Sequence, residues 1–142
     1  MTNDTVISTD KSKLDVALIH NFLRRSYWAE DIPLAVVEKS IANSLCFGIY
    51  EGASQVGFAR VITDYATFGY VADVFIVPTK QKQGLGKKLM AYIMDFPKLR
   101  GLRRWHLLTL DAQNLYKRVG FRTPANPEHH MEKRNPGIYK NQ

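Results

Sequence analysis

The stretch that decides the fold is Gln81-Lys82-Gln83-Gly84-Leu85-Gly86, followed directly by Lys87 and Lys88. An apolar run, Val74–Pro78, precedes it and has the composition of a buried strand. The residues after it, Leu85–Met94, repeat apolar side chains every three or four positions, as in an amphipathic helix. A strand, a glycine turn and a helix start together direct free backbone N–H groups and the positive end of a helix dipole at one spot. The sequence therefore predicts a phosphate-binding loop.

Two common phosphate loops do not fit this stretch. The Walker pattern needs glycine at position 81 and serine or threonine at 88, where this chain has Gln81 and Lys88. The dinucleotide fingerprint needs a third glycine where Leu89 stands. The remaining pattern, Gln-x-x-Gly-x-Gly after a strand that ends in Val-Pro, resembles the pyrophosphate loop of the GNAT superfamily of N-acyltransferases, which bind acetyl-CoA. The alternative is an ordinary glycine turn that opens a helix.

A second motif lies where this family would place it. Leu115–Phe121 resembles the late Leu-Tyr-x-x-x-Gly-Phe segment of the family, and an apolar strand, Trp105–Leu110, runs into it. The resemblance covers about residues 45–133, and the N-terminal third matches only by the order of its elements. Two motifs at the expected separation make the assignment to the family specific.

The resemblance implies the fold class and the domain organisation. We expect a single α/β (α+β) domain over residues 1–142, with a GNAT-like mixed, mostly antiparallel sheet flanked by helices. The expected order is β-α-α-β-β-β-α-β-α-β-β, with the last two strands near Phe121–Arg122 and His130–Glu132. Propensity alone predicts only a mixed α/β domain.

Composition limits the classes of protein that remain. Cys46 is the only cysteine, so no internal disulfide can form, which fits a reducing cytoplasm. No apolar run approaches the ~20 residues of a membrane span, and residues 1–10 contain no signal-peptide core, so we expect no membrane association. The net charge of +7 is accounted for in part by lysines beside the predicted phosphate loop, which makes nucleic-acid binding a minor alternative.

Acetyl transfer to an amine needs a neutral amine, a stabilised oxyanion and a proton for the leaving thiolate. The resemblance places Tyr116 at the general-acid position of the family, and the alternative is a tyrosine that packs against Phe121. Asp73 lies on the motif strand, where some relatives carry a glutamate near the acceptor, so it is the predicted base. An exposed strand aspartate is the alternative interpretation of Asp73, and His106 is the next candidate for the base.

The remaining predicted site residues bind the cosubstrate and the acceptor. Thr109 stands where relatives often carry an asparagine that contacts the pantetheine arm, and it offers only a hydroxyl. No metal site is expected, because the adjacent His129 and His130 would point to opposite faces of a strand. The residues predicted to bind acetyl-CoA are Phe75, Ile76, Val77, Gln81, Lys82, Gln83, Gly84, Leu85, Gly86, Lys87 and Thr109. Aromatic side chains predicted to line the acceptor site are those of Tyr27, Trp28 and Tyr65.

The leading hypothesis is an N-acetyltransferase that moves an acetyl group from acetyl-CoA to a primary amine, with a small-molecule acceptor favoured. Small amines, amino acids, antibiotics and protein lysines remain open as acceptors, as does a longer acyl-CoA as donor. A non-catalytic acyl-CoA-binding module is the main alternative, and a basic nucleic-acid-binding domain is the other. The sequence leaves the oligomeric state open, with a homodimer as one alternative.

Overall fold

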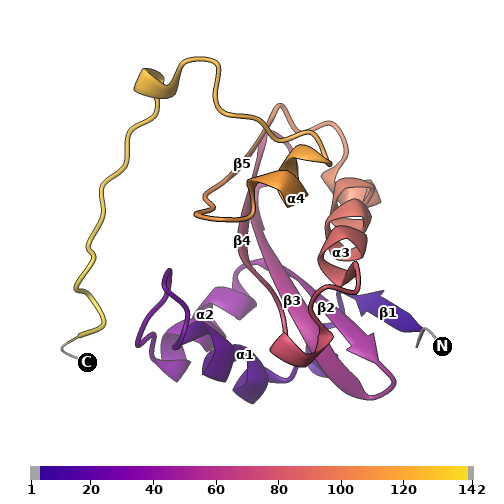
Figure 1. Ribbon diagram of the computed structural model, residues 1–142. Coiled ribbons are helices and arrows are strands. Elements are labelled where there is room, and N and C mark those ends of the chain that lie inside the picture. The colour runs from indigo at the N-terminus through magenta and orange to yellow at the C-terminus, as the bar shows by residue number, and fades with distance from the viewer. Residues whose placement is uncertain (1–3, 141–142) are drawn as a thin grey trace.

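A five-stranded sheet forms the centre of the protein, whose computed structural model describes residues 4–140 (Figure 1). The strands follow chain order across the sheet, and each neighbouring pair is antiparallel except the last two, which are parallel. The strands are β1 (Thr5–Ser8), β2 (Leu45–Glu51), β3 (Ser54–Thr63), β4 (Phe68–Ile76) and β5 (Arg104–Leu107). The helices are α1 (Val16–Leu23), α2 (Leu34–Ala42), α3 (Leu85–Met94) and α4 (Gln113–Lys117), with short 3₁₀ helices η1 (Lys11–Lys13), η2 (Pro78–Lys80), η3 (Pro97–Leu99) and η4 (Pro127–His129).

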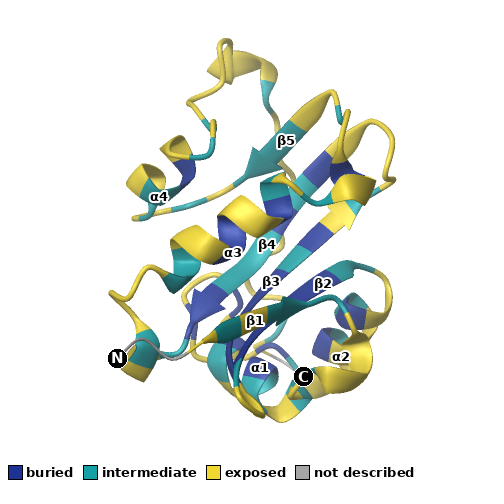
Figure 2. Cartoon of the chain, turned by 90° about the vertical axis from the view of Figure 1, so that its right-hand side faces the viewer, coloured by how far each residue is buried: buried dark blue, intermediate teal, exposed yellow. Residues whose placement is uncertain are grey.

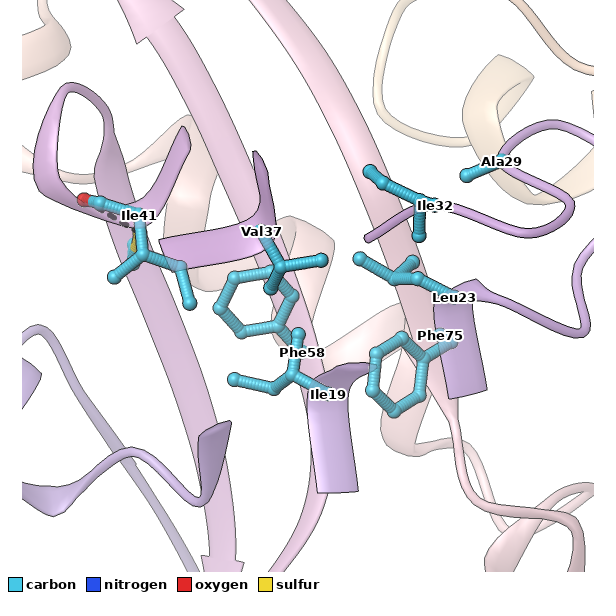
Figure 3. Close-up of a cluster of buried hydrophobic side chains, with 9 residues drawn as sticks. Ile19, Leu23, Ala29, Ile32, Val37, Ile41, Phe58 and Phe75 are labelled. Carbon is cyan, nitrogen blue, oxygen red and sulfur yellow. Dashed lines mark hydrogen bonds between the residues drawn. The ribbon is translucent and has the colours of Figure 1, made fainter. Parts of the chain in front are cut away.

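Helices α1 and α2 cover one face of the sheet. Ile19 and Leu23 from α1 and Val37 from α2 lie in one cluster with two sheet residues, Phe58 and Phe75 (Figure 3). The apolar positions of α1 are four residues apart, so they share one face of the helix and enter the core together. This cluster fixes the N-terminal helices over the end of β4 that leads to the glycine-rich stretch.

Helices α3 and α4 cover the opposite face. Leu89 and Ile93 of α3 are fully buried beside Phe47 of β2 and Val71 of β4. Strands β2 and β3 are therefore buried on both faces, while the outer side of α3 is exposed (Figure 2). Burial on both faces explains why these strands are nearly continuous apolar runs in the sequence.

The pairing between β4 and β5 stops early. Phe68–Val71 pair with Arg104–Leu107, and no residue of β5 pairs with β4 beyond Val71. Farther along β4, both Asp73 and Val74 lie opposite the single residue Ala59, which forms a β-bulge. Asp73 has a φ of 55°, in the left-handed region that non-glycine residues rarely adopt. The second half of β4 thus presents an unpaired backbone edge toward the β5 side.

The last two strands of the expected order are wrong. Residues 121–126 and 130–135 have no regular secondary structure, and only η4 forms between them. Pro124 and Pro127 cannot donate a backbone N–H to a strand ladder, and the backbone hydrogen bonds of the described residues 122–140 are local. The segment instead runs away from the sheet as an extended chain (Figure 1). The fold class and the first nine elements of the expected order are confirmed.

Across residues 4–140, none of the helices is long and apolar enough to cross a membrane.

Candidate functional site

The glycine-rich stretch forms the predicted strand–turn–helix geometry. Gly84 is the N-cap of α3, with a φ of 81° and no capping side chain. The first acceptor of the helix is the Gly84 carbonyl, which receives the N–H of Lys88 at 3.0 Å. Within residues 4–140, the backbone N–H groups of Gln83–Lys87 donate to no protein acceptor. These free donors at a helix N-terminus form a site suited to an anion.

Two side chains hold this loop against the sheet. Gln81 donates its side-chain N–H to the backbone carbonyl of Ile76 at 2.9 Å, which ties the loop to the end of β4. Lys80 forms a 2.9 Å ion pair with Glu51 at the β2–β3 turn. Gln81 therefore positions the loop backbone, and its contact with acetyl-CoA stays a prediction.

The lysines around the loop divide into two groups. Lys88 donates to Thr5 of β1, so its charge is directed away from the free amides. Within residues 4–140, the side chains of Lys82 and Lys87 form no hydrogen bond or salt bridge, and Lys82 has a strained φ of 65°. Lys82 and Lys87 are thus the cations of the loop that remain available to a phosphate.

Some backbone N–H groups at the end of β4, beside the loop, are already hydrogen-bonded to β3. Val77 donates its N–H to the carbonyl of Val56 at 2.8 Å, so this group is unavailable to a ligand. Backbone groups alternate in direction along a strand, so the N–H of Ile76 points to the unpaired edge. The Phe75 side chain is buried and stacks on Phe22 with ring centroids 4.0 Å apart. Of the three β4 residues predicted to bind acetyl-CoA, Phe75, Ile76 and Val77, it is Ile76 whose N–H faces the unpaired edge of the strand.

Tyr116 of α4 is buried at the side of the sheet that α3 covers. Its ring makes an edge-on contact with Phe121 at a centroid distance of 6.0 Å. Burial, with smaller contributions from Tyr27 and Asp111, raises the pKa of Tyr116 to about 12. The packing contact and a neutral phenol are both present, so the two sequence hypotheses for this residue are compatible.

Asp73 lies at the β4 bulge and is held by two donors. One carboxylate oxygen accepts a hydrogen bond from the indole N–H of Trp28 at 3.0 Å, and the other pairs with Arg60 at 2.9 Å. Its side chain is only 10% exposed, so the exposed strand aspartate considered from the sequence is wrong. Arg60 also donates to Ser44 at 3.0 Å, which fixes the guanidinium from a second direction. The base role of Asp73 stays a prediction.

The N-terminal helices bring two of the three predicted acceptor residues to this bulge. Tyr27 and Trp28 contact each other edge-on at 5.1 Å, and the Tyr27 hydroxyl accepts the backbone N–H of Leu110 at 3.2 Å. This hydrogen bond links the loop after α1 to the loop after β5. Tyr65 lies in the β3–β4 turn, at the far end of β4 from the phosphate loop, so the structure does not bring it to Tyr27 and Trp28.

Sequence reasoning missed Arg60 as the partner of Asp73 and the stacking of aromatic rings beside β5. Arg60 is a charged residue inside an otherwise apolar strand, and that contrast was the available signal. Tyr70, His106 and His130 stack in a row, with centroid distances of 5.8 and 5.6 Å. Thr109, predicted to contact the pantetheine arm, accepts the N–H of Ala112 at 3.0 Å and so shapes the turn into α4. Residues 4–140 contain no cluster of three or more His, Cys, Asp or Glu side chains that could hold a metal ion.

A parallel strand pair that opens beside a glycine-rich helix start, with a buried tyrosine nearby, is the arrangement that the resemblance to the GNAT superfamily implied. The model of the Acetyltransferase (GNAT) domain family matches residues 42–123, and the chain belongs to this family of acetyltransferases. Acetyl-CoA is the acetyl donor that the family uses.

Individual relatives agree with this assignment. The Gibberella zeae protein FG08082, whose name places it provisionally among the acetyltransferases, is 34% identical over 84% of this chain and 80% of its own length. The peptidyl-lysine N-acetyltransferase YiaC of Escherichia coli is 28% identical over 72% of this chain and 66% of its own. A crystal structure from Xanthomonas campestris pv. campestris, assigned provisionally to the GNAT acetyltransferases, has a TM-score of 0.94 at 48% identity and covers 98% of this chain and 99% of that one.

Proposed function

We propose that this protein transfers the acetyl group of acetyl-CoA to the primary amine of a small acceptor by direct attack, with Tyr116 as general acid. The observation that carries the proposal is the set of unpaired amides at Gln83–Lys87, next to the open edge of β4. The amides would hold the pyrophosphate, and the open edge would hold the pantetheine arm by strand-like hydrogen bonds. A cytoplasmic location is part of the proposal, because Cys46 is a free thiol in a chain without a possible internal disulfide.

The chemical step needs a hydrogen-bond donor to the oxyanion at the unpaired edge of β4. The amine nitrogen attacks the thioester carbonyl, a C–N bond forms, and the carbonyl oxygen acquires negative charge. The N–H of Ile76 faces the unpaired edge and would donate to this oxygen. When the tetrahedral adduct collapses, the carbonyl re-forms, the C–S bond breaks and its electron pair leaves with the sulfur, and the positively charged nitrogen releases its extra proton to water.

Tyr116 would stabilise that sulfur. The phenol stays protonated at neutral pH because its pKa is about 12, so it is always available as a donor. Full proton transfer to a thiolate whose conjugate acid has a pKa of about 8.5 is uphill by about 5 kcal/mol. Hydrogen-bond donation to the departing sulfur in the transition state is therefore the larger part of the role, with proton transfer following as charge develops.

The proton of the acceptor amine needs a route away. An alkylammonium has a pKa near ~10.4, so it must lose a proton before attack. Asp73 is the proposed base: Arg60 and Trp28 occupy one lone pair on each carboxylate oxygen and leave a second free. Replacement of Asp73 by asparagine tests this role directly.

An amine-panel assay that detects the free thiol of CoA tests the proposal. The panel contains small amines, amino acids, aminoglycosides and a lysine peptide, the last because the relative YiaC is named for peptidyl-lysine. We expect Tyr116→Phe to lower turnover tenfold or more, since a general acid typically contributes about 10²–10⁴-fold, and to leave acetyl-CoA affinity unchanged. Tyr92→Phe is the matched control, because Tyr92 lies on α3 and contacts Phe47 and Phe96.

Three experimental outcomes would contradict the proposed role of Tyr116 or favour one of the alternative functions. Equal turnover in the wild-type protein and Tyr116→Phe would leave Tyr116 with a packing role alone. Tight acetyl-CoA binding without thiol release from any amine would favour the non-catalytic acyl-CoA-binding module. Salt-sensitive binding to nucleic acid without acetyl-CoA affinity would favour the basic nucleic-acid-binding domain. Light scattering in solution measures the oligomeric state, for which a homodimer is a prediction.

A further inference from the structure

We propose that the acceptor carries an oxyanion group, a carboxylate or a phosphate, in addition to its amine, and that a basic pocket beside β5 binds this group. The proposal rests on the acetyl-transfer function above and names the acceptor class of the same site. The pocket has a volume of about 500 Å³ and lies between β5 with the loop after it, α4, and residues 121–130.

The pocket adjoins the predicted transfer point. Tyr116 and Thr109 both line the pocket, so the predicted general acid is part of the pocket wall. The free amides of the phosphate loop belong to α3 and lie outside the lining. The protein therefore offers two separate anion-binding surfaces, one for the pyrophosphate of the donor and one for a group on the acceptor.

The charge of the pocket has one sign. No aspartate or glutamate is among its lining residues. Across residues 4–140, the exposed side chains of Arg104, Lys117 and Arg122 form no salt bridge. Two carboxylates outside the lining act on pocket residues: Glu128 comes within 4.0 Å of the His129 ring, and the negative charge of Asp111 contributes to the raised pKa of Tyr116. The basic lining side chains are those of Arg104, His106, Lys117, Arg122, His129 and His130.

One imidazole reports the electrostatic potential of this surface. The pKa of His106 is lowered first by burial and then by the positive charges of His130 and Arg104. His106 also stacks between Tyr70 and His130, so its ring is fixed at the pocket wall. A bound oxyanion would offset the neighbouring positive charge and favour protonation of the ring.

Neutral donors complete the lining. Gln113, Thr123 and Asn126 can each donate hydrogen bonds to an oxyanion. A guanidinium such as that of Arg104 or Arg122 can bind a carboxylate or a phosphate through two parallel hydrogen bonds. This combination of cations and neutral donors suits an oxyanion and disfavours a second cationic group on the acceptor.

Matched acceptor pairs test the proposal in the full-length protein. Phenylalanine is compared with phenethylamine for a carboxylate, and O-phosphoethanolamine with ethanolamine for a phosphate. We expect kcat/KM to be at least tenfold higher for the anionic member of one pair, and the pair that shows the preference identifies the anion. Arg122→Gln and Arg104→Gln should each lower that value about tenfold, change kcat/KM for the acceptor that lacks the anion less than twofold, and leave acetyl-CoA affinity unchanged. Arg103→Gln, an exposed neighbour outside the pocket, is the control.

A binding measurement that requires no acetyl transfer tests this inference independently of the proposed function. NMR titration of the His106 ring, with and without phenylalanine or O-phosphoethanolamine, should show the pKa of His106 rising when the anion binds. Acetylation of amines with no preference for the anionic members would overturn the inference and leave the proposed function intact. If no amine is acetylated, a rise in the His106 pKa that Arg122→Gln abolishes still supports an oxyanion pocket, and an unchanged pKa overturns it.

Discussion

Gly84 offers the sharpest test of the phosphate loop. Its φ of 81° lies in the left-handed region, and a Cβ built on it would meet no atom within 4 Å. Gly84→Ala therefore introduces backbone strain without any steric clash in the folded protein. That strain costs about 1–2 kcal/mol of the free energy of unfolding. For a chain of this length, Tm should fall by about 3–8 °C and the protein should stay folded.

The effect on acetyl-CoA should be larger than this strain implies. The open space at Gly84 lies beside the free amides of the α3 start, so the new methyl group would stand where a phosphate must approach the backbone. Hydrogen bonds to a charged group contribute about 1.5–3 kcal/mol each, so losing one weakens binding by about 10–100-fold. Isothermal titration calorimetry with acetyl-CoA measures this change directly.

Gly101 provides a matched control. It has a φ of 83° and also meets no atom within 4 Å of a built Cβ, but it lies beyond the other end of α3. Gly101→Ala should produce a similar fall in Tm and no change in acetyl-CoA affinity. If the two variants bind acetyl-CoA equally well, the amides at Gly84 are not the pyrophosphate site.

Two further predictions follow from buried groups. Activity should rise with pH through neutrality, and Asp73→Asn should flatten this rise and lower kcat; unchanged slope and rate would move the base role to His106. Since Asp73 is paired with Arg60, the variant also leaves a guanidinium without its partner, so its Tm is measured alongside. Burial raises the pKa of the Cys46 thiol to about 11. The unfolded thiol ionises near ~8.5, so the unfolded state releases this proton first and stability should fall between about pH 9 and 11. Cys46→Ala should reduce this alkaline loss, as urea unfolding at several pH values would show; an equal loss in the variant would contradict the assignment.

Short-range patterns predicted the elements that carry the site. The alternation and spacing of apolar residues located β4, α3 and the strand before α4, because these signals depend on neighbours within a few residues. Gly84 was assigned to a turn at a helix start, and its left-handed φ agrees with that assignment. The same local reasoning wrongly predicted two strands near the C-terminus, where Pro124 and Pro127 interrupt the series of backbone N–H donors that a strand needs.

Long-range contacts decided what the individual side chains do. Asp73 meets Arg60 and Trp28 only because the β4 bulge turns it toward them, and the three residues come from separate elements. Lys88, which follows the loop in sequence, is held by Thr5 of β1 and so is directed away from the free amides. No local pattern encodes these pairings, since they depend on sheet register and on which helix packs against which face.

The sequence by itself determined the family, the glycine-rich helix start and the place of Tyr116 in the chain, because each rests on residue types at fixed short spacings. Only the tertiary structure decided that the N–H of Val77 belongs to β3 while that of Ile76 faces the opening. It also decided that the C-terminal segment stays outside the sheet and leaves a basic pocket beside β5. The physical reason is competition for backbone hydrogen bonds: a donor or a strand edge is available to a ligand only where the folded chain has not already paired it.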